Sequence, residues 1–152
     1  MMEILIGNRA TVLKMYLLDT NVVSELRKKS KANRGVKAFF SQSIKAESAL
    51  YLSVITIGEL RRGVELIRRR GDVKQAEILE AWLLNVIEDY SANILDFSEA
   101  EAQTWGCLRV PNHENALDKQ IAATALTYDL CIVTRNISDF QGTGVRVLNP
   151  FE

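Results

Sequence analysis

Short apolar runs alternate with stretches of helical periodicity along this chain, and no other feature constrains its fold as strongly. The apolar runs are rich in Leu, Ile and Val and predict strands at residues 16–18, 50–55, 93–97, 130–134 and 145–149. Strands that alternate with helices in this way favour an α/β fold with a mainly parallel sheet. In such sheets, ligands bind outside the carboxyl ends of the strands.

The helical segments lie between these runs. A short helix is predicted from about residue 21, and longer ones at 35–47, 56–70, 74–90, 98–109 and 115–129. Two of them begin with a possible capping box, in which a Ser or Thr precedes a Glu by three residues. These pairs are Ser98 with Glu101 and Thr56 with Glu59.

One domain is expected, because 152 residues can bury a sizeable core without staples. Residues 15–152 would form it. Residues 1–14 are expected to be an N-terminal extension, disordered or translated from an upstream start. The 19 Lys and Arg balance 19 Asp and Glu, which argues against nucleic-acid binding through global charge but not against a local basic rim. No apolar run approaches the roughly 18 residues of a membrane span, so we expect a cytoplasmic protein without membrane contact.

The single histidine and the two cysteines limit the chemistry. A zinc site with several histidines is excluded, and a Ser-His-Asp triad would have to use His113. We interpret His113 as a loop residue without a catalytic task. Cys107 and Cys131 lie in apolar contexts without metal-binding spacing and are predicted to be small core residues.

Four acidic residues stand where a parallel sheet would bring them together. Asp19 ends the first strand, Glu59 lies just after the second, and Asp139 lies in the polar loop after the strand at 130–134. Asp118 opens the helix that precedes that strand. Each acid also has a structural alternative: helix capping for the first two, helix-dipole compensation for Asp118 and an Asx turn for Asp139.

As a group, these acids indicate a metal site. Carboxylates a few ångströms apart cannot all ionise without a counter-charge. Hard divalent cations such as Mg²⁺ supply that charge, using carboxylate oxygens and water as ligands. Two such ions about 4 Å apart form the clamp used for in-line phosphodiester cleavage. With one histidine in the chain, water activation by a metal is the more available route to hydrolysis.

Four segments resemble, in order, the motifs of PIN-domain ribonucleases. They are "LLDTNVVSEL", "SVITIGEL", "LDKQIAATAL" and "IVTRNISDFQGTGVRVLNP". The similarity runs from about Met15 to Glu152 and is closest to VapC/FitB-type toxins of bacterial toxin–antitoxin pairs. It implies a three-layer α/β/α sandwich around a mainly parallel sheet. It also implies an Mg²⁺- or Mn²⁺-dependent endoribonuclease. Our hypothesis for its mechanism is hydrolysis of RNA by metal-activated water, leaving a 5′-phosphate and a 3′-hydroxyl.

The resemblance assigns roles motif by motif. The catalytic and metal-binding acids correspond to Asp19, Glu59, Asp118 and Asp139. Thr134 matches a hydroxyl residue that supports the first acid by hydrogen bonding, and Asn21 is a further supporting residue. Asn136 stands where many relatives carry another acid, so one charge is removed and the second metal is expected to bind more weakly.

Basic residues near the acids are candidates for RNA contacts. Arg61 and Arg62 follow the second acid, Arg135 follows the strand at 130–134, and Lys28 follows the first helix. A solvated surface or compensation of a helix C-terminus would also explain them. The resemblance further implies a homodimer and a cognate antitoxin that covers the acidic site. The alternative function is a non-catalytic PIN-like module that binds protein or RNA, which would usually have lost one or more of the acids.

Overall fold

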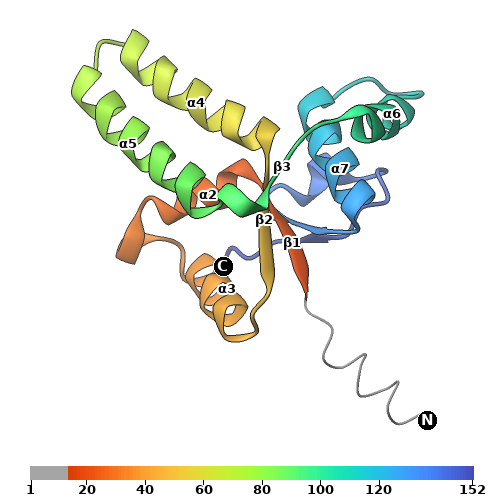
Figure 1. The fold of residues 1–152 in the computed structure, drawn as a ribbon, viewed down its shortest axis with the longest axis horizontal. Coiled ribbons are helices and arrows are strands. Elements are labelled where there is room, and N and C mark those ends of the chain that lie inside the picture. Colours follow the sequence, from red (N-terminus) through yellow and green to blue (C-terminus); the bar gives the residue numbers. More distant parts are fainter. Residues whose placement is uncertain (1–13) are drawn as a thin grey trace.

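The computed structural model describes residues 14–152, and its centre is a parallel sheet of five strands (Figure 1). The strands are β1 (Met15–Leu18), β2 (Ala49–Ser53), β3 (Ile94–Leu95), β4 (Cys131–Val133) and β5 (Val147–Leu148). They lie in the order β3-β2-β1-β4-β5, and every pair of neighbours is parallel. The carboxyl ends of the three central strands therefore meet at one edge of the sheet.

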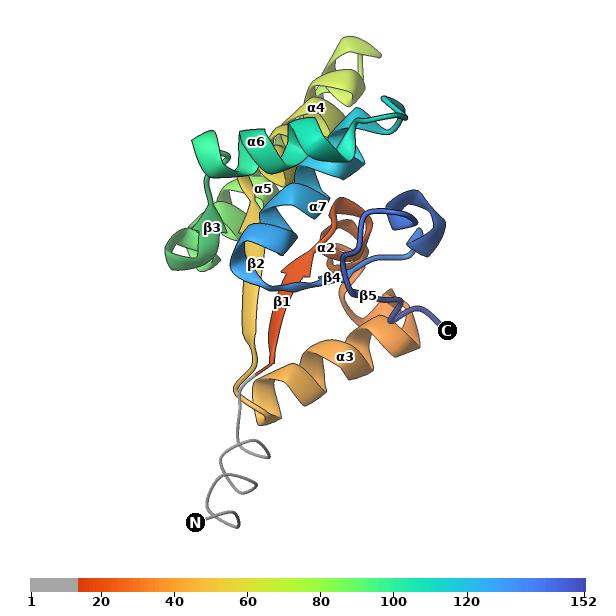
Figure 2. The ribbon, with the colours of Figure 1, turned by 90° about the vertical axis from the view of Figure 1, so that its right-hand side faces the viewer.

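Helices cover both faces of this sheet (Figures 1 and 2). They are α2 (Thr20–Leu26), α3 (Arg34–Lys45), α4 (Val54–Arg69), α5 (Val73–Asp89), α6 (Glu99–Leu108) and α7 (Ala116–Tyr128). Leu18 and Val133 pack in one core cluster with residues of α2, α3, α4 and α5. Leu17 and Ile132, one position earlier in each strand, pack in a second cluster with residues of α7. The three-layer α/β/α sandwich is confirmed.

The second strand ends earlier than predicted. The sequence predicts a strand over 50–55, but α4 begins at Val54, and Ser53 is its N-cap. The Ser53 hydroxyl accepts a hydrogen bond from the Ile55 amide at 3.0 Å. The prediction that Thr56 and Glu59 form a capping box is therefore wrong. Thr56 is buried within the first turn, and its hydroxyl has no hydrogen-bond partner among the described residues.

The edge strands are also shorter than predicted. β3 and β5 have two residues each, where the apolar runs predict strands over 93–97 and 145–149. Short edge strands limit the row of unpaired backbone groups that invites pairing with another chain. The deviation is confined to the sheet edges and does not alter the carboxyl ends of β1, β2 and β4.

Of the other local predictions, one is confirmed and one is partly wrong. The capping box of Ser98 and Glu101 is present at the start of α6. The prediction that both cysteines are core residues is wrong for Cys107, which is exposed on α6. Cys131 is only half-buried at the start of β4. An apolar context in sequence did not decide burial, because it does not say which side of a helix faces solvent.

No helix within residues 14–152 has the length and apolar character needed to cross a membrane. The predicted N-terminal extension falls almost wholly outside the described residues, which begin at Lys14.

Candidate active site

A cavity of about 380 Å³ opens at the carboxyl edge of the central strands. Three of the four predicted acids line it: Asp19 directly after β1, Glu59 in α4 and Asp118 in the first turn of α7. Asp139 lies in the short 3₁₀ helix Ile137–Phe140 after β4 and does not line the cavity. Its negative charge nevertheless raises the pKa of both Asp19 and Asp118, after the larger effect of their burial.

Asp19 is both a helix cap and the most enclosed acid of the site. Its side chain is only 8% exposed. One carboxylate oxygen accepts a hydrogen bond from the Thr20 amide at 2.8 Å, which caps α2. The other accepts from the Thr134 hydroxyl at 2.9 Å. Burial raises the pKa of Asp19, and the hydrogen bonds from Thr134 and Thr20 oppose that rise.

Thr134 is the centre of a small network that holds Asp19. While it donates to Asp19, its oxygen accepts from the Asn21 amide group at 3.3 Å and from the Asn136 backbone amide at 3.0 Å. Asn21 also accepts a hydrogen bond from the Arg135 backbone amide at 3.0 Å. The three predicted supporting residues thus lie together, and they join the start of α2 to the loop after β4.

The pKa of Asp118 shows the effect of the negative charge in the cavity most clearly. This pKa is raised to about 6, first by burial and then by the charges of Asp139, Asp19 and Glu59 in that order. None of the ion pairs among residues 14–152 involves any of these four acids. The cavity therefore carries negative charge without a basic partner from the described chain, and it favours a proton or a cation.

The oxygen donors fit a hard divalent cation. In their present conformations, no three acidic, histidine or cysteine side chains of residues 14–152 are grouped closely enough to enclose an ion by themselves. Mg²⁺ does not require such a cage, because it usually keeps several waters and binds one or two carboxylates. Asp19, Asp118 and Glu59 offer carboxylates to one cavity, and the amide of Asn136 lines it as well.

The basic candidates for RNA contact have different surroundings. Lys28 Nζ lies 2.9 Å from a carboxylate oxygen of Glu25. The Glu25 side chain of this pair is buried. One guanidinium nitrogen of Arg61 lies 3.4 Å from Glu80 and 3.5 Å from Glu65. The Arg61 pairs are exposed, so they are worth little and can be exchanged for a phosphate. Arg62 and Arg135 are exposed and have no ion pair within the described part of the chain. His113 is exposed in the loop before α7, the position that the sequence predicts for it.

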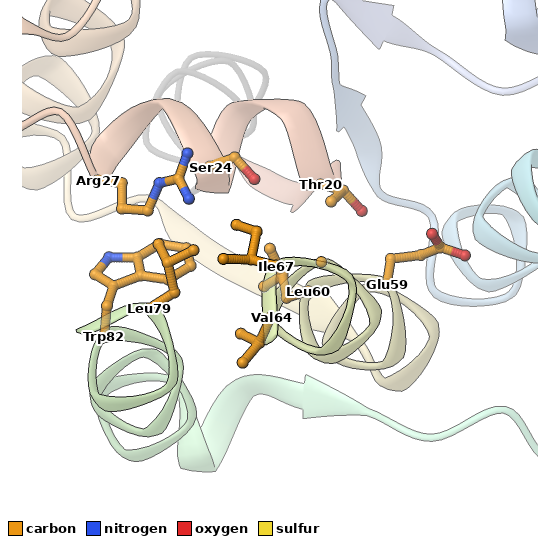
Figure 3. A pocket seen from close by; sticks show the side chains of 10 residues that line it. Thr20, Ser24, Arg27, Glu59, Leu60, Val64, Ile67, Leu79 and Trp82 are labelled. Atoms are coloured by element: carbon orange, nitrogen blue, oxygen red, sulfur yellow. The ribbon is translucent and has the colours of Figure 1, made fainter. Parts of the chain in front are cut away.

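A second, more apolar groove adjoins the acidic cavity, and the sequence did not reveal it (Figure 3). Its volume is about 210 Å³. It lies between α2, α4 and α5, and Thr20 and Glu59 line both it and the acidic cavity. In Figure 3 the guanidinium of Arg27 lies beside the ring of Trp82, with Cζ 5.8 Å from the ring centroid. The remaining lining residues are Ser24, Leu60, Gly63, Val64, Ile67 and Leu79.

Sequence reasoning also missed the apolar part of the acidic cavity. Ile55, Leu117 and Ile121 line it beside the acids. Ile55 was assigned to the strand at 50–55, although Ser53 was available as an N-cap signal two residues before it. Leu117 is 51% exposed at the start of α7, so its place on the rim depends on how that helix meets the sheet.

Comparison with known proteins shows the family of the chain. The family model for the PIN domain matches residues 16–143. VapC ribonuclease Y4jK of Sinorhizobium fredii is 35% identical over 91% of this chain and 99% of that protein. Toxin FitB of Neisseria gonorrhoeae is 34% identical over 90% of this chain and 99% of that protein.

Solved structures give the same result. A crystal structure of FitAcB from Neisseria gonorrhoeae matches with a TM-score of 0.77 and 34% identity, over 90% of this chain and 98% of that one. A toxin–antitoxin complex from Klebsiella pneumoniae matches with a TM-score of 0.57 and 27% identity, over 90% of this chain and 98% of that one. The chain belongs to the PIN-domain family and is a homologue of the VapC and FitB toxins.

Proposed function

We propose that this chain is a metal-dependent endoribonuclease and the toxin of a toxin–antitoxin pair, with Mg²⁺ or Mn²⁺ as its cofactor. The observation that carries the proposal is the cavity at the carboxyl edge of the sheet. It collects Asp19, Glu59 and Asp118, and the pKa of Asp118 is raised to about 6 by burial and by the charges of the other three acids. The similarity to a protein named as a VapC ribonuclease supports RNA as the substrate.

Each acid has a proposed task. Asp19, Asp118 and Asp139 would hold the cation, directly or through water, and Glu59 would complete the set or orient the attacking water. A bound divalent cation supplies a nucleophile at neutral pH and stabilises charge on the phosphate. Thr134 keeps the Asp19 carboxylate in one orientation. The products would carry a 5′-phosphate and a 3′-hydroxyl.

The direct test is cleavage of a panel of labelled RNAs, including transfer RNA, ribosomal RNA fragments and messenger RNA. The antitoxin-free protein is expected to cut at least one of them with Mg²⁺ or Mn²⁺ and none with EDTA, because the acids repel one another and the phosphate unless a cation is present. End-labelling of the fragments reads out the 5′-phosphate.

Calorimetric titration with Mn²⁺ is the matched control. If the protein binds metal but cleaves none of the RNAs, the metal site is supported and the substrate lies outside the panel. Neither cleavage nor metal binding would contradict the proposal and favour a non-catalytic binding module.

We also propose that the apolar groove of Figure 3 receives the cognate antitoxin. Its apolar residues from α4 and α5 offer a surface for a partner side chain or helix, and its shared residues Thr20 and Glu59 connect it to the acidic cavity. A partner seated there would obstruct the acids without any change in the fold. The homodimer implied by the family stays a prediction, which analytical ultracentrifugation would test.

Gly63→Arg is expected to weaken inhibition of RNA cleavage by purified antitoxin by at least about tenfold. The arginine side chain would occupy space that the partner needs, and a loss of about 1.4 kcal/mol of binding free energy corresponds to this factor. Gly63 lines the groove and has open space where a side chain would begin, so the substitution fills the groove and spares the core. The control is Gly106→Arg, at another helical glycine with open space, on α6. Equal inhibition of both variants would place the antitoxin elsewhere.

A further inference from the structure

The last residues of the chain are fixed against the start of α3. The Asn33 side chain accepts a hydrogen bond from the Glu152 amide at 3.1 Å and donates one to the Glu152 backbone oxygen at 2.9 Å. Arg34 lies 3.0 Å from the Glu152 carboxylate. The tail also passes very close to Gly35, where an added Cβ would lie 2.1 Å from the Pro150 oxygen. Residues 149–152, here called the C-terminal tail, are therefore fixed at the start of α3. Figure 2 shows the C-terminus near this helix.

This tail presents an aromatic ring to the loop that carries Arg135. The Cζ atom of Arg135 lies 4.8 Å from the centroid of the Phe151 ring. Arg135 stands between Thr134, which bonds Asp19, and Asn136, which lines the acidic cavity. Its backbone amide is anchored on Asn21. The backbone of Arg135 is therefore fixed by Asn21, and its guanidinium is fixed by the ring of Phe151.

The arginine is held, but its hydrogen-bonding capacity is unused. Its guanidinium makes no hydrogen bond and no ion pair with any residue from 14 to 152. The contact of the guanidinium with the aromatic ring uses none of its N–H groups as hydrogen-bond donors to oxygen, so these donors stay free. Those donors match the paired oxygens of a phosphate.

The contact between Arg135 and Phe151 also affects the electrostatics of the site. A flexible arginine beside a cavity with excess negative charge would be drawn onto the carboxylates and would compete with a cation. The ring of Phe151 offers an alternative resting place with a known attraction for cations. Arg135 itself does not line the cavity, and its charge, after the larger effect of a lysine hydrogen bond, lowers the pKa of Glu25 on α2 rather than that of Asp19 or Asp118. Held in this way beside the cavity, it can bind a phosphate without neutralising Asp19 or Asp118.

We propose that Phe151 is a positioning residue, which sets Arg135 to bind a backbone phosphate of RNA at the mouth of the acidic cavity. The inference rests on the proposed ribonuclease function and deepens it. It assigns the C-terminal tail to the substrate-binding apparatus. Arg135 makes the phosphate contact, and Phe151 acts only through it.

RNA binding in the Asp19→Asn background tests this role without cleavage. Fluorescence anisotropy with labelled single-stranded RNA of mixed sequence in EDTA gives the Kd over a range of KCl concentrations. Arg135→Met is expected to weaken binding about tenfold and to reduce the salt slope by about one, as for a single phosphate contact. Phe151→Leu is expected to weaken binding by about threefold, because Arg135 remains but is no longer fixed. The double variant should match Arg135→Met.

Two controls separate positioning from stability. Phe151→Tyr keeps the aromatic face and is expected to retain the parental Kd. Phe151→Met also keeps apolar volume without that face, and it replaces Phe151→Leu if the latter unfolds; the same threefold weakening is then expected. In cleavage assays with Asp19 restored, Phe151→Leu should raise KM about threefold and leave kcat unchanged, because it affects uniform substrate binding.

The outcomes are distinct. Parental Kd and salt slope in Phe151→Leu, or fully additive losses in the double variant, would overturn the positioning role while leaving the ribonuclease proposal intact. A parent that binds no RNA, together with a wild-type protein that cuts none, would overturn both.

Discussion

Asp19→Asn is expected to lower the rate of RNA cleavage by about 10³-fold, the scale of losing a preorganised electrostatic contact in a catalytic site. Asparagine keeps the size of the side chain and can still cap α2, since Asn and Asp are equally good N-caps. It removes the negative charge that the proposed cation requires. Cleavage of the preferred RNA with Mg²⁺, followed under single-turnover conditions, measures the loss.

The matched control is Asp72→Asn. Asp72 caps α5 by accepting a hydrogen bond from the Gln75 amide at 3.1 Å, and it lies outside the acidic cavity. The two variants thus change the same chemical group at two helix caps. Only the Asp19 variant should lose activity. Equal activity of Asp19→Asn and wild type would remove Asp19 from the catalytic scheme.

The same variant carries a stability prediction whose sign follows from the pKa. Burial holds the pKa of Asp19 above its value of 3.8 in the unfolded chain. The folded state therefore binds this proton more tightly, and ionisation destabilises it as pH rises through the folded pKa. Asp19→Asn removes that penalty. In EDTA, its Tm relative to wild type should increase from pH 4 to pH 8.

The order of elements and the place of the acids could be read from the sequence because each rests on a local pattern. Leu17 and Leu18 face opposite core clusters, so β1 is buried on both faces and appears as an unbroken apolar run. Asp19 follows that run directly. In a parallel sheet, this position lies at the ligand-binding edge whatever the rest of the fold does.

The missed features depend on contacts between distant segments or on competing local signals. Val54 and Ile55 are β-branched and prolong the apolar run of β2, which hid the Ser53 cap. The apolar groove exists only because α5 brings Leu79 and Trp82 to α4. The stacking of Arg135 on Phe151 joins residues whose separation in sequence carries no periodic signal.

Thr134→Val is expected to lower RNA cleavage roughly ten- to a hundredfold, the usual effect of removing a group that orients a metal ligand. Valine has nearly the shape of threonine but cannot donate to Asp19 or accept from Asn21 and Asn136. Thr134 is fully buried, so its partners would lose hydrogen bonds that water cannot easily replace. The free energy of unfolding should fall by about 1–3 kcal/mol, measured by urea denaturation.

The pH profile distinguishes an effect on Asp19 from simple loss of stability. The Thr134 hydroxyl lowers the pKa of Asp19 against the larger effect of burial, so its removal should raise that pKa further. Protons then compete with the cation up to a higher pH, and the acid limb of the cleavage profile should move to higher pH. Thr134→Ser keeps the hydroxyl and should restore both the rate and the profile. A valine variant with reduced stability and an unshifted profile would make Thr134 a structural residue only, because orientation of Asp19 is the one role that couples it to proton binding.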